Sequence, residues 1–490
     1  MISAADIIAL LPILVISATA VVVMLVIAFR RSHALAAGLT LGGLASAFIS
    51  IFLAVRLAPR QVTSLLLVDR FALFYVGLII ASVAVVAMLS YGYLKHKDVH
   101  RDELYLLLLL ATLGCVVLVA STHFVSFLLG LEILSVSLYA LIAYLKDRNQ
   151  ALEAGIKYLV LASASAAFLL FGMALIYADT GTMEFSSIRE ISLGGSGLGL
   201  LVPGVVLTVT GIGFKLGVVP FHLWTPDVYE GAPAPVAAFV ATTSKTAMVA
   251  LLLRYADLSG VFAYRGVFLV FAIIAIASMC AGNLLALGQR NVKRILAYSS
   301  IAHFGYILVA FLAGGVMGIE AASFYLVAYT ATLLAAFGVV TVFSNAARDA
   351  DDIEDYRGLF WQRPVLVSVL TLALLSLAGI PATMGFVSKF YVLAAGAEAS
   401  VWPLILILAI TSVAGLFYYL RVVVALYSAP PAHSFTEAIS ISKTGAFVVV
   451  ALSILLIWSG IYPTPLLKLV QRAAAPRDAR DAAFVTKLNK

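Results

Sequence analysis

The chain is a succession of long apolar runs separated by short polar segments. A run of about 18 or more apolar residues is long enough to cross the hydrocarbon core of a bilayer as a helix. The pattern predicts about 14 spanning helices of roughly 20 residues each. The predicted spans are residues 5–29, 34–58, 71–94, 104–120, 124–145, 154–177, 199–221, 236–254, 266–287, 294–314, 318–344, 365–395, 401–427 and 445–461.

Composition agrees with this pattern. Of the 490 residues, 63% are hydrophobic and only 11% are charged, and the mean hydropathy is +1.09. Such a chain has too little polar surface to cover a soluble globule, so we predict an all-α polytopic membrane protein. The first apolar run continues to Phe29, which is longer than the apolar region of a signal peptide, at about 7 to 15 residues. We therefore expect a retained first span.

The basic residues predict an orientation. An even number of spans puts both ends of the chain on one side of the membrane. With the N-terminus outside, the outer loops hold few basic residues, and the inner loops hold most of them: Arg30, Arg31, Lys95, Lys97, Arg101, Lys146, Arg148, Arg290, Lys293, Arg294, Arg348, Arg357, Arg363 and Lys443. Because lysine and arginine favour the inner side, both termini are predicted to lie outside. The basic residues after Leu467 weigh against this, but charges late in a chain carry less weight.

Two of the predicted spans are abnormal. Residues 365–395 would form a helix of about 46 Å, longer than a hydrocarbon core of about 30 Å. Gly379 and Pro381 interrupt this twelfth span, so we predict two half-helices. The seventh span carries Pro203, Gly211 and Gly213 and is predicted to be broken too. Broken helices five positions apart indicate two inverted five-helix repeats with a transport route between them.

These breaks suggest a division of the chain. Residues 1–103 are predicted to be an N-terminal three-helix segment. Residues 104–254 would be the first repeat, with helices four to eight. Residues 255–427 would be the second repeat, with helices nine to thirteen, and residues 428–490 the last helix and a C-terminal tail.

Charged side chains inside the spans are the candidate functional residues. A lysine at the centre of a spanning helix costs roughly 2.5 to 3.5 kcal/mol, so such residues usually face a polar interior and have a function there. Lys215, Lys245 and Lys389 are of this kind. Glu132 lies roughly 13 Å into the fifth span, where it is either half of a structural ion pair or a proton-handling carboxylate paired with Lys215.

Other polar residues allow two readings. Lys157 lies near the start of its span, where it either takes part in proton transfer or extends to the interface. His303 is either a proton relay or a hydrogen-bonded interior histidine. Lys293 and Arg294 are interpreted as ordinary charges of an inner loop, with the lining of a water channel as the alternative. The loop FHLWTPDVYEGAPAPV is interpreted as a rigid reversal whose Trp224 anchors at the membrane interface, together with Tyr229.

Several kinds of site have no sequence signal. The chain contains no GxGxxG, GxxxxGK[ST] or HExxH motif and no cysteine cluster. Its two cysteines, Cys115 and Cys280, are far apart in apolar runs. We therefore expect no nucleotide, metal or iron–sulfur site on this chain.

Three segments carry a family resemblance. GFKLGVVPFHLWTPDVYEGAPAPVAAFVATTSK, RNVKRILAYSSIAHFGY and GIPATMGFVSKFYV together resemble the antiporter-like membrane subunits of proton-pumping NADH:quinone oxidoreductase, respiratory complex I. The loop sequence HLWTPDVYEGAPAPV is similar to that of the subunit N branch of the family. Subunit N is the counterpart of mitochondrial subunit 2. The resemblance covers essentially the whole chain.

The resemblance implies a function and a set of residues. Glu132 and Lys215 match the family's glutamate–lysine pair, Lys245 its connecting lysine and Lys389 its twelfth-helix lysine, while Lys157 matches a further lysine. It implies a subunit of a bacterial inner (cytoplasmic) membrane enzyme, and the basic loops then predict both termini on the periplasmic side. FMN, iron–sulfur clusters and the contacts with NADH and quinone would belong to partner subunits. The alternatives are a subunit of a multi-subunit cation/proton antiporter and a proton-inert membrane scaffold.

Overall fold

Helices account for most of the chain, as the hydropathy pattern predicts. The computed structural model describes residues 3–95, 97, 99–193, 199–260, 264–345, 348–429 and 443–475. The elements are α1 (Ala4–Ala9), α2 (Leu11–Phe29), α3 (His33–Ala54), β1 (Arg60–Thr63), β2 (Leu66–Val68), α4 (Arg70–Leu94), α5 (Glu103–Ala120), α6 (Phe124–Ile142), α7 (Asn149–Thr180), α8 (Phe185–Leu193), α9 (Leu201–Leu216), α10 (Trp224–Gly231), α11 (Ala234–Phe239), the π-helix η1 (Val240–Ser244), α12 (Lys245–Ser259), α13 (Arg265–Leu287), α14 (Val292–Ala313), α15 (Gly315–Phe343), the 3-10 helices η3 (Ile353–Tyr356) and η4 (Leu359–Trp361), α16 (Pro364–Ala378), α17 (Met384–Glu398), α18 (Trp402–Tyr427), α19 (Lys443–Ile461) and α20 (Thr464–Ala474).

The predicted spans coincide with these helices. Among the described residues, 12 helices are long and apolar enough to cross a membrane. The two remaining predicted spans, 199–221 and 365–395, contain the shorter apolar helices α9 and α16. The all-α polytopic fold is confirmed, whereas the count of 14 spans and the inverted repeats stay predictions.

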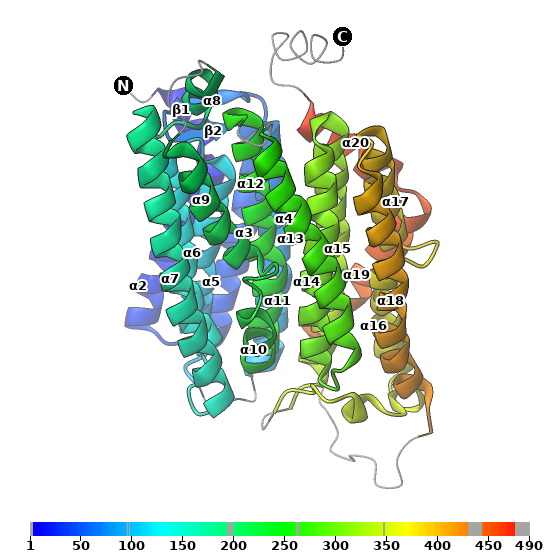
Figure 1. Ribbon diagram of the computed structural model, residues 1–490. Helices are drawn as coiled ribbons and strands as arrows, with labels where there is room; N and C mark the ends of the chain where they lie inside the picture. Colours follow the sequence, from blue (N-terminus) through cyan, green and yellow to red (C-terminus); the bar gives the residue numbers. More distant parts are fainter. Residues whose placement is uncertain are drawn as a thin grey trace.

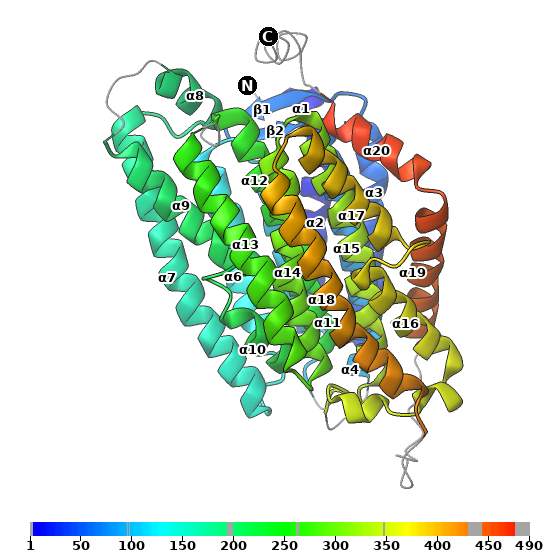
Figure 2. The same cartoon turned by 45° about the vertical axis from the view of Figure 1, so that its right-hand side comes forward.

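The helices stand side by side in one bundle (Figures 1 and 2). Its centre is formed by α11 and α12 together with α14 and α15, whose residues are almost all buried. In contrast, only about a third or fewer of the residues of α2, α7 and α18 are buried, as expected of helices that face lipid. The first and last described helices, α1 and α20, lie at the same end, together with the hairpin of β1 and β2 (Figure 2). We call this the terminal end and the other the opposite end.

Both spans are interrupted, and each interruption is at a glycine. The twelfth span breaks at Gly379 as predicted, whereas α9 continues through Pro203, Gly211 and Gly213 and ends only after Lys215. Helix α9 ends at Leu216 and is followed by Gly217 with φ +69°, while α16 ends at Ala378 and is followed by Gly379 with φ +84°. Backbone with such positive φ favours glycine. A Cβ at Gly217 would lie 3.1 Å from Nζ of Lys245, and one at Gly379 would lie 2.8 Å from Cδ of Lys389. Each break therefore also makes room for a buried lysine.

One irregular segment was not predicted from the sequence. The eighth predicted span, 236–254, is α11 followed by the π-helix η1 and α12, and Lys245 is the first residue of α12. A π-helical turn re-aims side chains and is frequent at functional sites. The sequence also gave no prediction of α8, α10, the β hairpin or the amphipathic α20 as separate elements.

Two of the three predicted division points fall at helix ends. Position 103 is the first residue of α5, position 254 falls within α12, and position 427 is the last residue of α18. The chain after Ala475, with most of its tail charges, lies outside the described residues. The four-part division stays a prediction.

A buried ion pair joins two helices at the terminal end. Nη2 of Arg254 lies 2.8 Å from Oδ1 of Asp69, and the two side chains are 0% and 4% exposed. Arg254 also donates through Nε to the carbonyl of Val119 at 2.9 Å. These contacts hold α12 against the start of α4 and the end of α5.

We expect Asp69→Ala to destabilise the protein strongly, because it leaves the guanidinium of Arg254 buried without its carboxylate. Breaking a buried pair in this way costs about 3 to 5 kcal/mol. The matched control is Glu103→Ala, which removes an exposed pair with Arg31, worth about 0 to 1 kcal/mol. Thermal unfolding of the purified membrane protein measures both. Equal melting temperatures for the two variants would contradict the assignment.

Candidate functional site

Lys215 lies in the last turn of α9 and is buried, with 3% of its surface exposed. Its Nζ donates to Oγ of Ser135 at 3.0 Å and to the hydroxyl of Tyr158 at 2.9 Å. Both partners are neutral oxygen groups, one from α6 and one from α7. The ammonium group is thus solvated by side chains of the helices that surround the break.

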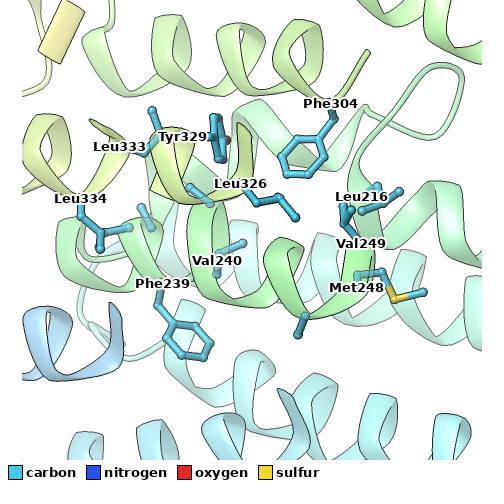
Figure 3. Close-up of a cluster of buried hydrophobic side chains, with 14 of the residues drawn as sticks. Leu216, Phe239, Val240, Met248, Val249, Phe304, Leu326, Tyr329, Leu333 and Leu334 are labelled. Atoms are coloured by element: carbon cyan, nitrogen blue, oxygen red, sulfur yellow. The ribbon is translucent and has the colours of Figure 1, made fainter. Parts of the chain in front are cut away.

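Lys245, at the start of α12, is fully buried. Its Nζ donates to Oγ of Ser300 at 3.0 Å, and the hydroxyl of Tyr329 donates to the same oxygen at 2.7 Å. The amine also lies 4.7 Å from the ring centre of Phe304, which gives a favourable cation–π contact. Phe304, Tyr329 and neighbouring aliphatic side chains form the apolar wall around this part of the bundle (Figure 3).

An aromatic contact connects the surroundings of these two lysines. The hydroxyl of Tyr158 binds Lys215. Its ring packs edge-on against the ring of Trp224, with 5.0 Å between the ring centres. Nζ of Lys245 lies 5.7 Å from the Trp224 ring centre. Trp224 Nε1 donates to the carbonyl of Phe214 at 2.8 Å, which fixes the indole beside the end of α9.

The interpretation of the loop after Lys215 was therefore wrong in one respect. Trp224 is 2% exposed and Tyr229 is 0% exposed, so neither anchors at the membrane interface. The proline-rich reversal turns these side chains into the bundle, where Tyr229 lies 3.1 Å from Oγ of Ser300. A tryptophan near prolines can face either way, and the sequence does not distinguish the two.

His303 lies in a hydrogen-bonded group in the middle of α14. Its Nδ1 is 2.6 Å from the hydroxyl of Tyr325, and its Nε2 is 3.1 Å from the hydroxyl of Tyr419. Both ring nitrogens thus have phenolic partners, which can donate or accept. Ser300, which binds Lys245, is three residues earlier in α14, on the same face of the helix.

Lys389 lies in α17, and its amine is bound at the break between the half-helices. Nζ donates to the carbonyl oxygens of Leu377 and Ala378 at 2.8 and 2.9 Å, and to Oγ of Ser412 at 2.7 Å. The two carbonyls belong to the C-terminal end of α16, where the last turn leaves carbonyl groups without helical partners. The helix dipole at such an end favours a positive charge.

A small cavity lies between His303 and the helix break. Its volume of about 10 Å³ is roughly the room that one water molecule needs. It is lined by His303, Tyr325, Ala328, Tyr329, Thr332, Ser376, Leu377, Gly385 and Ser388. Most of the surface that faces the cavity is apolar, but six of these nine residues carry a polar side chain, which gives a water molecule partners beside Leu377, whose carbonyl binds Lys389.

Glu132 does not form an ion pair with Lys215 in this structure. The side chain is half-buried on α6, and the ion pairs found in the described parts of the chain do not include one between Glu132 and Lys215. The carboxylate lies within electrostatic reach of Lys215, one helical turn before Ser135. The structure therefore shows the glutamate and the lysine apart, with Ser135 and Tyr158 binding the amine.

Lys157 belongs to a separate group of charges on the flank of the bundle. Its side chain is 44% exposed and pairs with Glu153 and Asp227 at 2.7 and 2.8 Å. Asp227 also binds Arg294 at 2.9 Å, which in turn binds Glu230 at 2.7 Å. The structure does not bring Lys157 into the row of buried lysines, although the next residue, Tyr158, contacts Lys215.

Lys293 is buried, against its interpretation as a loop charge, with 1% of its surface exposed. Nζ lies 2.9 Å from Oδ2 of Asp349, which also contacts Arg148 and accepts a hydrogen bond from Tyr93. Burial raises the pKa of Asp349, but Lys293, Tyr93 and Lys97 outweigh it and bring the pKa to about 2. Burial lowers the pKa of Lys97 to about 8 despite Asp349. A buried charged cluster thus joins several helices at the opposite end.

Sequence reasoning missed the uncharged partners of the lysines. Serine and tyrosine are common in apolar spans, so Ser135, Tyr158, Ser300 and Tyr329 carry no signal by themselves. The one available clue was their helical spacing from a charged residue, as with Ser135 three residues after Glu132. Asp227 and Glu230 stand in the loop motif but were not predicted to bind Lys157 or Arg294.

More than half of the chain matches a known protein family. Residues 121–415 match the family described as NADH:quinone oxidoreductase/Mrp antiporter, TM. A similar curated relative is NADH-quinone oxidoreductase subunit N of Ectopseudomonas mendocina (strain ymp), with 49% identity over 481 residues, 96% of this chain and 97% of the relative.

Solved structures give the same result for the fold. A chain of respiratory complex I from Thermus thermophilus with bound aureothin is 33% identical, with a TM-score of 0.81 over 94% of this chain and 99% of that one. A chain of the Mrp complex from Dietzia sp. DQ12-45-1b has a TM-score of 0.84 over 96% and 97%, at 19% identity, and shows the fold alone. The predicted resemblance is confirmed: the chain belongs to the NADH-quinone oxidoreductase subunit N family of antiporter-like membrane proteins.

Proposed function

We propose that this chain is a membrane-arm subunit of a proton-pumping NADH:quinone oxidoreductase and translocates protons through Glu132, Lys215, Lys245 and Lys389. Quinone reduction in partner subunits supplies the free energy. His303 connects the two halves of the row, between Lys245 and Lys389. Lys157 acts indirectly at most, through its neighbour Tyr158.

The row of buried amines with neutral partners is the observation that carries this proposal. In the described residues, Lys215, Lys245 and Lys389 have oxygen partners but no carboxylate within ion-pair distance. A buried charge without a counter-ion is expensive unless it is fully hydrogen-bonded. Hydroxyl groups accept a hydrogen bond from an ammonium and donate one to a neutral amine, so Ser135, Tyr158 and Ser300 can serve both protonation states.

Glu132 is proposed to control the first of these lysines. An ionised carboxylate close to an amine favours the charged amine, and its withdrawal removes that stabilisation. The half-buried Glu132, one turn away from Ser135, is placed to approach Lys215 by a change of side-chain conformation. The separated arrangement in this structure corresponds to the state in which the Lys215 proton moves on toward Lys245.

The remaining chemistry is assigned to partner subunits. The described residues contain no cluster of three or more His, Cys, Asp or Glu side chains that could hold a metal ion, and FMN and the iron–sulfur clusters are proposed to lie in other chains. The chain lies in a bacterial inner membrane as a multi-pass subunit. Its terminal end faces the periplasm, because the loops at the opposite end carry most of the basic residues.

A second candidate function is that of a subunit in a multi-subunit cation/proton antiporter. The likeness in fold to the Mrp complex favours it. A proton-inert scaffold is the third. Native purification followed by identification of the partner chains separates the first two, since flavin- and iron–sulfur-binding partners are expected only for the respiratory enzyme. Neutral substitution of Glu132, Lys215, Lys245 and Lys389 without loss of pumping would favour the scaffold.

We expect Lys215→Ala to lower proton pumping coupled to quinone reduction, because it removes the amine from the first half of the row. NADH-driven acidification of inverted membrane vesicles measures this, with the rate divided by the NADH oxidised. The matched control is Lys95→Ala, which removes an exposed lysine at the opposite end. Fully coupled pumping in the Lys215→Ala enzyme would remove this lysine from the mechanism.

For Glu132 we expect a graded result. Glu132→Ala lowers pumping less than Lys215→Ala does, because the hydrogen bonds of the amine to Ser135 and Tyr158 remain. Glu132→Asp keeps the charge and pumps at nearly the rate of the unsubstituted enzyme. The same vesicle measurement compares the three, and equal damage from Glu132→Ala and Glu132→Asp would favour a purely structural glutamate.

A further inference from the structure

One carboxylate does not belong to the row of buried lysines. It lies in the second half of the chain, near the terminal end of the bundle. Glu320 is in the second turn of α15, which begins at Gly315. Its Oε2 accepts a hydrogen bond from the hydroxyl of Tyr391 in α17. Both side chains are partly exposed, so this contact lies at the edge of the bundle.

The two helices form a seam that leads from the central cavity to this contact. On α17, Gly385 and Ser388 line the cavity, and Tyr391, three residues further on, contacts Glu320 of α15. Residues three apart are neighbours on the helix surface, so the three follow one another along α17. On α15, Ala328 lines the cavity, and Glu320 lies eight residues closer to the terminal end. At 1.5 Å per residue this is about 12 Å along the helix.

The inner end of the seam begins next to Lys389. Leu377, whose carbonyl oxygen binds Nζ of Lys389, also lines the cavity. Ser388, the neighbour of Lys389 in α17, lines the cavity as well. The amine and the cavity thus meet at the same residue of the helix break, Leu377.

One apolar residue narrows the seam. Phe324 is 0% exposed and packs edge-on against the ring of Tyr391, with 6.2 Å between ring centres. It stands between Ala328 and Glu320 on the same face of α15. Helix α20 packs over α15 at the terminal end, and its Gln471 lies next to the hydroxyl of Tyr391. The passage is thus narrow and covered.

We propose that Glu320, reached through Tyr391 along the seam between α15 and α17, is the group at which protons leave the Lys389 region toward the terminal end of the bundle. Lys389 gives a proton to water in the cavity, Tyr391 accepts one from the cavity side as it passes its own to the carboxylate, and Glu320 releases it to the solvent. This inference rests on the proposed function and adds its outlet.

The test uses the complete enzyme in inverted membrane vesicles, with acidification divided by the NADH oxidised. We expect Glu320→Gln and Tyr391→Phe each to lose as much pumping as Lys389→Ala, and Glu320→Asp to retain it. The matched control is Asp257→Asn, which removes an exposed carboxylate of α12 at the same end. Because Tyr391→Phe keeps the ring against Phe324, it decides the question even if Glu320→Gln impairs assembly.

The outcomes separate the two proposals. Loss of pumping in Lys389→Ala but not in Glu320→Gln or Tyr391→Phe overturns the outlet and leaves the proposed function intact. Full pumping in all three overturns both. An equal loss in Asp257→Asn assigns the effect to the charge of the surface and overturns the outlet.

Accessibility gives a readout that is independent of pumping. We expect Glu320→Cys in the assembled enzyme to react with a membrane-impermeant thiol reagent added on the side of the terminal end, above the labelling of the unsubstituted chain with Cys115 and Cys280. Labelling from the other side only, or none from either side, would contradict an outlet at this position.

Discussion

The structure depends on how buried ammonium groups are solvated inside an apolar bundle. Lys215, Lys245 and Lys389 sit where water is scarce, and each replaces its hydration shell with oxygen atoms of neighbouring helices. Hydroxyl and carbonyl oxygens bind an ammonium without neutralising it. For Lys389 this requires an interruption of the helix, because a regular span has no free backbone oxygen. Lys215 and Lys245 are bound by side-chain hydroxyl groups instead.

The interruptions follow one pattern in the two halves of the chain. A half-helix ends, a glycine with positive φ turns the backbone, and a lysine lies against that glycine. At Gly379 the freed carbonyls bind the lysine directly, whereas at Gly217 the lysine partners are side chains. Each glycine therefore does two things: it adopts the positive φ that ends the half-helix, and it leaves room for the lysine side chain.

Much of this could be predicted from the sequence, for a physical reason. Each span must be apolar whatever its neighbours are, so hydropathy locates the helices and makes the lysines conspicuous. The break in residues 365–395 follows from length and glycine content alone. Partners and orientations depend on tertiary packing instead: Lys293 is buried only because Asp349, 56 residues away, neutralises it, and the separation of Glu132 from Lys215 depends on side-chain conformation.

The charged cluster at the opposite end has a mechanical consequence. One carboxylate, Asp349, contacts Tyr93 of α4, Lys293 of α14 and Arg148 beside α7, and it lies in the loop after α15, six residues beyond Phe343. These helix ends are therefore tied to a single point of the chain. A displacement of Asp349 therefore acts on the ends of α4, α7 and α14 together, so this cluster couples helix ends from both halves of the chain.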